Sequence, residues 1–336
     1  MLQWLQLYEI DEPLVMSVIK SLDENFDDYA IYGANAGDIL IVASAGKQLP
    51  QLPLALPATP QLVAELKHVG IASPQDIAVR RLATKKSLAP LLKTYAIGIN
   101  SDYHPVLDQN ASAARFIGQG ANSLMNLAVE PLPLVEMLNG DHAPWTQTAV
   151  SANGHLAKMH PGSVAGFFRD HLLGTQSTGF SPEQHATLAR QVNDMLAYCV
   201  RPPDGDAAFA LMRIGGLLAP FLQPQELQTL WPRLEALPCA QALLGTQRDW
   251  LLLLKAVGQR DALAMAQTSS RLIDNHEDKT ALRRRYLLAA GMLGYIAAGK
   301  PMQAHALWDA NASAALENRA PSLMLRILAA HAGVNP

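Results

Sequence analysis

Three polar side chains lie near the carboxyl end of the first strand that the sequence predicts. Gln3, Gln6 and Tyr8 belong to residues 2–8, whose tryptophan, leucine and tyrosine content is typical of a strand. Open α/β sheets bind their ligands at the carboxyl ends of strands, so these amides and this phenol could contact a substrate amine. The simpler interpretation is an edge strand with ordinary polar residues.

Three acidic residues follow this strand. Glu9, Asp11 and Glu12 could together attract a cationic ligand. A local explanation competes with this one. Asp11 is placed to cap the next helix, and Glu12 would then lie in its first turn, where a negative charge interacts favourably with the helix dipole.

A second polar cluster occupies residues 100–105, Asn-Ser-Asp-Tyr-His-Pro. Its aspartate, Asp102, is a candidate for a catalytic or substrate-binding role. The alternative is that Asp102 caps or braces the loop before Pro105.

Two other constellations are weaker. His155, His160 and His171 are separated by five and eleven residues, which does not match an i, i+4 helical pair, so we expect no metal site. Asp170 and His171 beside a serine, Ser163 or Ser177, have the composition of a hydrolase triad, but the G-x-S-x-G turn that such enzymes need is absent. The sequence therefore offers no complete catalytic set.

Length and charge narrow the class of protein. A chain of 336 residues is long enough for about two domains. The net charge of −3 argues against nucleic-acid binding, which requires a basic surface. The short basic runs Arg283-Arg284-Arg285 and Lys85-Lys86 are expected to be solvated faces.

The two cysteines, Cys199 and Cys239, are expected to be plain buried thiols in a reducing compartment. This predicts a cytoplasmic location. No stretch reaches the ~20 apolar residues that a membrane span requires. No signal peptide is visible at the N-terminus.

The N-terminal pattern predicts strand, helix, strand, turn and strand. After the first strand, apolar residues at 14, 15, 18, 19 and 22 recur at helical spacing. Residues 29–32 and 39–43 read as two short strands, and the turn between them predicts an antiparallel hairpin. Residues 47–60 contain four prolines and read as an extended connection, followed by short helices that begin near Pro60 and Pro74.

These elements supply at most three strands, which is too little sheet to be stable alone. The first strand also begins at the initiator methionine, which leaves no room for a preceding element. We therefore expect the last third of a larger sheet. Its exposed edge would make the chain prone to pairing with other chains and marginally soluble.

From residue 111 onward the sequence predicts helices only. Pro232 is expected to kink or end one of them, and Gly258, Gly299 and Gly333 are expected to be C-terminal caps. The predicted helices are residues 111–129, 132–138, 182–200, 207–221, 225–236, 241–257, 261–272, 279–298 and 301–315.

One predicted helical hairpin has a recognisable register. Tyr295, Gly299, Ala304 and Trp308 reproduce the Y-x3-G-x4-A-x3-aromatic core of a tetratricopeptide unit. The small residues would let two antiparallel helices approach, and the aromatic ring would fill the gap to the next pair. The preceding hairpin matches poorly, so the sequence predicts tetratricopeptide-like hairpins and not a regular array.

The N-terminal third resembles the spermidine synthase-like (polyamine aminopropyltransferase) family, whose catalytic domain has the class I methyltransferase fold. The matching segments are Gln-Trp-Leu-Gln-Leu-Tyr-Glu at 3–9, the hairpin end Gly-Asp-Ile-Leu-Ile-Val-Ala at 37–43, and 99–107, which looks like the family's N-T-D-D-x-P-x-L-E segment. The similarity is greatest to the bacterial branch in which this domain is fused to membrane spans before it and helical repeats after it.

The resemblance implies that the first strand is the fifth of seven and that the hairpin supplies the last two. The loop for decarboxylated S-adenosylmethionine and the catalytic aspartates lie earlier in such proteins, so this chain alone would bind no cofactor and contain no catalytic residue. Two departures weaken the match to a polyamine pocket: the hairpin turn lacks the family's tyrosine, and Tyr103 replaces the second acidic residue of the later motif.

The expected fold class is therefore α/β, an incomplete methyltransferase-like sheet, followed by all-α tetratricopeptide-like hairpins. The expected divisions are residues 1–48, the end of the α/β domain; 49–110, a proline-rich connection with short helices; and 111–336, the helical region. The expected function is that of the C-terminal portion of a spermidine synthase-like protein, inactive by itself. The alternative is a non-enzymatic helical scaffold. The expected partners are a protein or a second copy bound through the helices, or a chain that supplies the missing strands.

Overall fold

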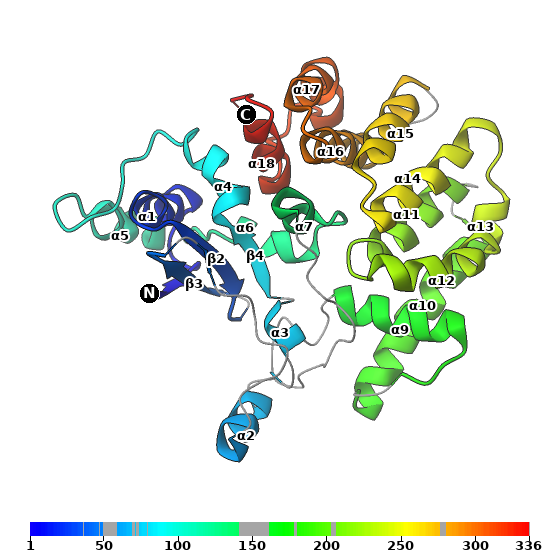
Figure 1. Cartoon of the computed structure of the whole chain (residues 1–336), viewed down its shortest axis with the longest axis horizontal. Helices are drawn as coiled ribbons and strands as arrows, with labels where there is room; N and C mark the ends of the chain where they lie inside the picture. The colour runs from blue at the N-terminus through cyan, green and yellow to red at the C-terminus, as the bar shows by residue number, and fades with distance from the viewer. Residues whose placement is uncertain are drawn as a thin grey trace.

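A computed structural model shows a small sheet on one side of the molecule and helices filling the other (Figure 1). The mixed α/β part followed by helices agrees with the expected fold class at this coarse level. Most of the predicted proline-rich connection at 47–60 lies outside the described residues. The structure describes residues 1–35, 37–46, 48–49, 59–68, 71, 74–78, 80–140, 161–177, 180–202, 206–275 and 280–335.

The sheet has four strands among the described residues, in the order β1-β3-β2-β4, and each neighbouring pair is antiparallel. The predicted hairpin of β2 and β3 is confirmed. The prediction of at most three strands is wrong, because β4 pairs with the outer side of β2; a four-residue strand followed directly by a helix is too short to show alternation. The strands are β1 (Leu2–Gln6), β2 (Asp28–Gly33), β3 (Asp38–Ser44) and β4 (Arg81–Thr84).

The strand β3 lies between β1 and β2 and runs antiparallel to both. β1 and β2 are therefore parallel to each other, and helix α1 (Glu12–Asn25) connects them. One face of the three strands packs into the core, with Leu5, Ile31, Ile39 and Ile41 at most 6% exposed. The helices α1 and α4 (Lys85–Leu92) both contact β2 and contribute to this core.

Helix α1 begins as its sequence predicts. The Asp11 carboxylate accepts a hydrogen bond from the Leu14 N–H at 2.9 Å, and the proline in the first turn loses no hydrogen bond there. The predicted apolar stripe is confirmed in its main members, since the buried residues of α1 include Leu14, Val15, Ile19 and Leu22.

Short elements lead from the sheet into the helical region. They are α2 (Pro60–His68), α3 (Pro74–Ala78), α5 (Val106–Phe116), α6 (Ser123–Asn126), the 3-10 turn η1 (Leu127–Val129) and α7 (Leu134–Asn139). The two predicted prolines, Pro60 and Pro74, do begin α2 and α3.

The remaining elements are helical. They are α9 (Pro161–Leu173), α10 (Pro182–Val200), α11 (Ala207–Leu218), α12 (Pro224–Glu235), α13 (Pro238–Gln241), η3 (Gly245–Arg248), α14 (Asp249–Gln259), α15 (Ala262–Asp274), α16 (Ala281–Ala297), α17 (Pro301–Leu316) and α18 (Leu323–His331). The last helix, α18, packs against both α4 and α16, so the end of the chain lies between the sheet and the other helices (Figure 1).

Two of the predicted helices are wrong as single elements, because a glycine interrupts each. The predicted helix 111–129 ends at Phe116, and Gly118 adopts a left-handed φ of 67°. The predicted helix 241–257 starts only at α14, after Gly245 with a φ of 54°. By contrast, the predicted helix 182–200 coincides with α10.

Small residues on α16 allow α15 and α17 to pack closely on either side of it. A Cβ atom at Gly294 would lie 2.6 Å from the Ala262 carbonyl oxygen, and one at Gly291 would lie 2.6 Å from a methyl group of Leu307. Gly299 follows α16 with a φ of 72°, as predicted for a cap. The close approach of these helices is therefore made at Gly291 and Gly294, which are not among the residues of the predicted tetratricopeptide register.

The prediction that Gly258 caps a helix is wrong. Gly258 is buried inside α14, where a Cβ would meet Leu227 at 2.9 Å, and Arg260 takes the left-handed conformation instead. The Arg260 side chain forms a buried ion pair with Glu136 at 2.9 Å and donates to the Ala219 carbonyl at 2.6 Å. Arg260 thus joins α7, α11 and α14.

The prediction that the two cysteines are free thiols is also wrong. Cys199 and Cys239 are not free thiols but form a disulfide that joins the end of α10 to α13. A separation of 40 residues hides the pairing from the sequence, because nothing local shows that α13 returns to α10. The expectation of a reducing, cytoplasmic environment rested on free thiols and loses that basis.

We expect Gly294→Ala to destabilise the chain by about 1–3 kcal/mol, because the new methyl group would collide with the main chain of α15, which cannot rotate away. Urea denaturation would measure the change. Gly98→Ala is the matched control, since a Cβ there meets nothing within 4 Å, and it should be neutral or slightly stabilising. Equal stability of the two variants would contradict the packing of α15 on α16.

Candidate functional site

The carboxyl end of β1 is enclosed by two turns that are distant in sequence. The Leu7 N–H donates to the Gly37 carbonyl in the β2–β3 turn at 2.7 Å, and the Leu7 carbonyl accepts from Ala121 at 2.7 Å. Tyr8 forms an isolated bridge with Gly120, and its ring lies against Gly37, where a Cβ would be 3.2 Å away. This is the end of the sheet at which a ligand was expected.

The two glutamines predicted to bind a ligand instead bond their own strand. Gln3 donates from Nε2 to the Trp4 carbonyl at 2.7 Å, and Gln6 donates from Nε2 to the Tyr8 carbonyl at 3.2 Å. Both amides therefore satisfy main-chain oxygens near the exposed side of β1. A ligand would have to replace these bonds.

The three acidic residues after β1 do not come together as one binding site for a cation. Glu9 has a left-handed φ of 61° and forms an exposed ion pair with Arg115 at 3.3 Å. Asp11 is the cap of α1, and Glu12 points into the protein. The prediction that Asp11 caps α1 is confirmed. The prediction that Glu12 interacts with the dipole of α1 is incomplete, because the side chains that bond Glu12 come from distant parts of the chain.

Glu12 is the centre of a polar cluster, the Glu12 cluster, formed with Tyr95, Ser123 and Arg326. Arg326 donates from Nη2 to both Glu12 oxygens at 2.5 and 2.7 Å, and from Nη1 to the Tyr95 hydroxyl at 2.9 Å. The Tyr95 and Ser123 hydroxyls also donate to the carboxylate. Burial alone would raise the pKa of Glu12, but these hydrogen bonds and the Arg326 charge hold that pKa below its ordinary value.

Asp102 lies apart from the other predicted site residues. Its exposed loop is braced by its neighbours, because Asn100 accepts from the Leu107 N–H at 2.9 Å and Ser101 accepts from the His104 N–H at 3.1 Å. The loop precedes the first residue of α5, whereas Arg115, which pairs with Glu9, lies near the last. At 1.5 Å per residue, the two ends of α5 are roughly 15 Å apart. The structure thus brings Gln6 and Tyr8 together but not Asp102.

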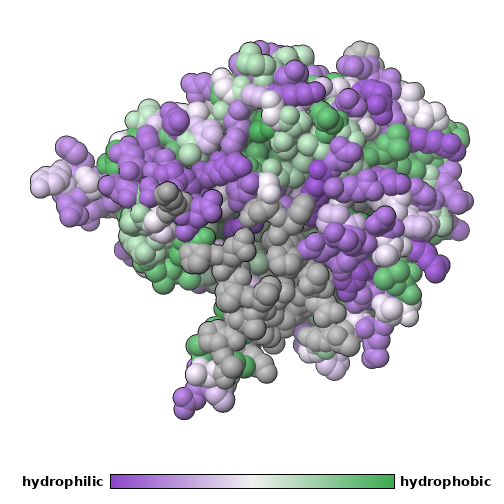
Figure 2. Space-filling view, viewed as in Figure 1, coloured by the Kyte–Doolittle hydropathy of each residue, from purple (hydrophilic) through white to green (hydrophobic). Residues whose placement is uncertain are grey.

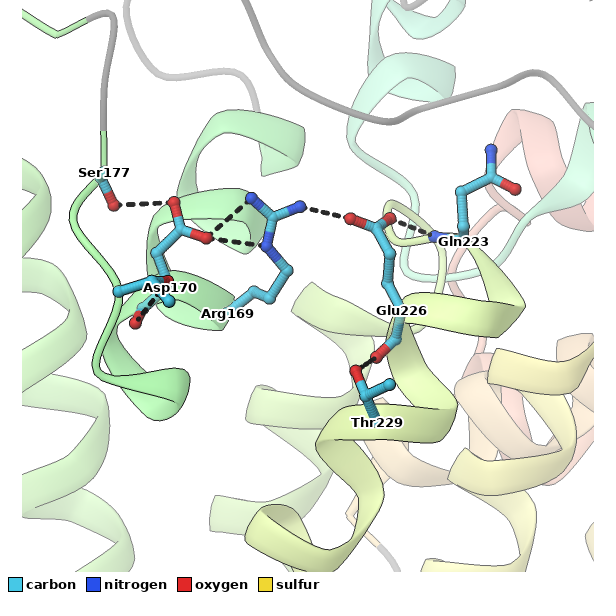
Figure 3. Close-up of polar contacts among 7 residues, drawn as sticks. Arg169, Asp170, Ser177, Gln223, Glu226 and Thr229 are labelled. Carbon is cyan, nitrogen blue, oxygen red and sulfur yellow. Dashed lines mark hydrogen bonds and ion pairs between the residues drawn. The ribbon is translucent and has the colours of Figure 1, made fainter.

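The residues weighed as a hydrolase triad form an ion-pair network instead (Figure 3). Asp170 accepts from Arg169 at 2.8 Å and from the Ser177 hydroxyl at 3.0 Å, and Arg169 also pairs with Glu226. His171 is exposed and makes no contact with this network among the interactions of the described residues. Without a base on the serine, no nucleophile is activated.

No metal site emerges from the part of the chain that the structure describes, where no group of three His, Cys, Asp or Glu residues converges. His155 and His160 lie outside the described residues, as does the side chain of Ser163. Burial raises the pKa of Glu130, which directly follows η1, to about 7.

The sequence suggested that the two basic runs are solvated faces, but each run contains a residue with partners inside the protein. Lys85 donates to the carbonyl groups of Asp23 and Phe26, both at 2.6 Å, and so ties α4 to the end of α1. Arg283 is 6% exposed and forms an ion pair with Asp206. Neither partner is near in sequence, which is why the short basic runs gave no signal of burial.

Exposed apolar side chains form a rim around β1. We call it the β1 rim; its exposed members are Met1, Leu2, Trp4, Tyr8, Phe116 and Ile117. Leu2 is 66% and Trp4 is 52% exposed, and they lie opposite Val42 and Leu40 on the face of the sheet away from the core. Figure 2 shows hydrophobic surface on the part of the molecule where the N-terminus lies in Figure 1.

The main chain of β1 is open on the same side. Met1 exchanges two hydrogen bonds with Ala43, so alternate residues of β1 face β3, and the peptide groups of Leu2, Trp4 and Gln6 face outward. No strand of the described residues pairs with this edge. The rim therefore combines exposed apolar side chains with peptide groups that pair with no described strand, although the Trp4 carbonyl accepts a hydrogen bond from the Gln3 side chain.

Comparison with known proteins gives no identification. No family model matches the chain, and no curated protein and no solved structure matches it. Among the described helices, none has both the length and the apolar character needed to cross a bilayer.

We expect Glu12→Gln to destabilise the chain by about 2–3 kcal/mol at pH 7, because it leaves Arg326 without its counter-charge. The pKa of Glu12 is lowered, so its stabilisation is present above its ordinary value of 4.5 and is lost as the pH falls below it. The urea midpoint of the Glu12→Gln variant should therefore lie below that of the wild type at pH 7, and the two midpoints should approach each other as the pH is lowered.

Arg271→Met is the matched control for the Glu12 cluster. Arg271 is half exposed and pairs with Asp249 at 3.4 Å, so its loss should cost less than about 1 kcal/mol. A Glu12→Gln variant that is no less stable than Arg271→Met would show that the cluster contributes nothing.

Proposed function

We propose that this chain is the C-terminal portion of a spermidine synthase-like protein, in which the end of a methyltransferase-like sheet is followed by tetratricopeptide-like helices. The observation that carries the proposal is the β1 rim. An edge strand with exposed tryptophan and leucine, whose outer peptide groups pair with no described strand, is a liability that proteins normally cover. Further strands beside β1 would pair its peptide groups, and the helices that accompany them would cover its apolar face.

The strand order is compatible with this proposal. It makes β1, β2 and β3 the fifth, sixth and seventh strands of the larger sheet, with the seventh between the other two. The parallel relation of β1 and β2 across α1 is that of a β-α-β crossover, the unit from which such sheets are built. The fourth strand, β4, would extend the sheet beyond the seven.

The full-length relative would transfer an aminopropyl group or bind a related nucleoside cofactor. The residues of this chain do not fit decarboxylated S-adenosylmethionine or the reaction by themselves. Gln3 and Gln6 are bonded to their own strand, and Glu12 is held by Arg326. Aminopropyl transfer needs carboxylates that orient an amine and accept its proton, so we infer that this chain alone is inactive.

A different class of function, a non-enzymatic helical scaffold, has one observation in its favour. The tight packing of α15, α16 and α17 forms a rigid helical layer of the kind that repeat proteins use to bind partners. In this case the sheet would serve only as a docking surface, and a protein partner or a second copy would bind the helices.

The coding DNA upstream of Met1 distinguishes the two functions. The enzyme-derived proposal expects an in-frame glycine-rich loop and paired aspartates there. A start codon at Met1 with its own ribosome-binding site supports the scaffold. Turnover of putrescine and decarboxylated S-adenosylmethionine by this chain alone would refute the inferred inactivity.

We expect the isolated chain to self-associate through the β1 rim and the double variant Leu2→Lys, Trp4→Lys to remain monomeric, because charge on an open edge opposes strand pairing. Sedimentation velocity over a tenfold or greater range of concentration would measure the change. Met302→Lys is the control, since Met302 is 73% exposed on α17, far along the chain from the rim. Association that is lost in the control but kept in the double variant would favour the helical scaffold.

A further inference from the structure

The disulfide lies in the interior of the helical region. Cys199 is the penultimate residue of α10 and Cys239 the second residue of α13, and their Cα atoms are 4.8 Å apart. Cys199 is 1% exposed and Cys239 is fully buried. The Cys239 N–H also donates to the Cys199 sulfur at 3.2 Å.

The helices around the disulfide pack against one another and enclose it. Both α10 and α11 contact α13, and α11 contacts α10, so the bridge closes a loop whose own helices cover it. The chain has only these two cysteines, and both are used. A distance of 4.8 Å falls within the 4.4–6.8 Å that joined cysteines usually span.

We infer that the helical region matures in an oxidising compartment, where a thiol–disulfide oxidoreductase joins Cys199 to Cys239. The two thiols lose two protons and two electrons as the S–S bond forms, and the electrons reduce the disulfide of the oxidoreductase to a dithiol. Structural disulfides persist in such compartments and are rare where thiol reductants are maintained. The inference does not depend on the proposed function.

Burial explains why the bond would last once it is made. Exchange requires a thiolate to reach a sulfur atom, and neither sulfur is accessible unless α10 and α13 separate. Oxidation must therefore precede or accompany the docking of α13, and reduction of the native protein should be slow.

The test uses the full chain, directed either to the bacterial periplasm or to a reducing cytosol and purified without reductant. Denaturation, alkylation with a maleimide and intact mass would count the thiols. We expect no modified cysteine in the periplasmic chain. Two modified cysteines in that chain would overturn the inference.

Stability supplies a second readout. Reducing the periplasmic chain should raise its unfolding equilibrium constant by roughly 30- to 1,000-fold, as expected for a bridge that closes a loop of this length. The Cys199→Ala, Cys239→Ala variant should match the reduced chain and should not respond to reductant. An oxidised chain no more stable than the reduced chain would overturn the inference, even if the alanine variant failed to fold.

Discussion

The ion pair of Glu12 with Arg326 holds the first helix of the chain to the last one, across 314 residues. Tyr95 and Ser123 also bond Glu12, so three distant segments converge on its carboxylate. Because α18 also packs between α4 and α16, the sheet and the helical region share one structural support. The same contact withdraws Glu12 from any ligand, since its oxygens are already bonded.

The two edges of the sheet differ in a way that shapes the functional interpretation. The strand β4, which forms one edge, is contacted by α4, α7 and η1. The edge at β1 has neither a strand nor a helix of the described residues along it, and it carries the largest apolar side chains of the strand outward. A sheet finished on one side and open on the other is what both proposed functions must explain.

Local signals predicted local structure well. Asp11 and the apolar stripe of α1 announced that helix, and Ser181 with Gln184 forms the capping box that fixes the start of α10. The hairpin of β2 and β3 was equally visible. Of the glycines with positive φ, Gly299 and Gly333 were predicted as caps, whereas Gly118 and Gly245 were missed because each lay inside or next to a segment predicted as one helix.

What the sequence could not supply were partners distant in the chain. The disulfide, the Glu12 cluster and the burial of Arg283 each join segments that only the complete fold brings together. The predicted site shows the same limit: the sequence placed Gln3 and Gln6 on the right strand, but it did not show that their side chains bond the main-chain carbonyls of Trp4 and Tyr8.

The position of α18 also sets an order for folding during synthesis. The ribosome releases Tyr95 some 231 residues before Arg326, an interval of roughly ten to fifty seconds at ordinary translation rates. Throughout that time the nascent sheet lacks its final support, and the Glu12 carboxylate has no cation to meet it. The sheet therefore folds without this ion pair until α18 has been made.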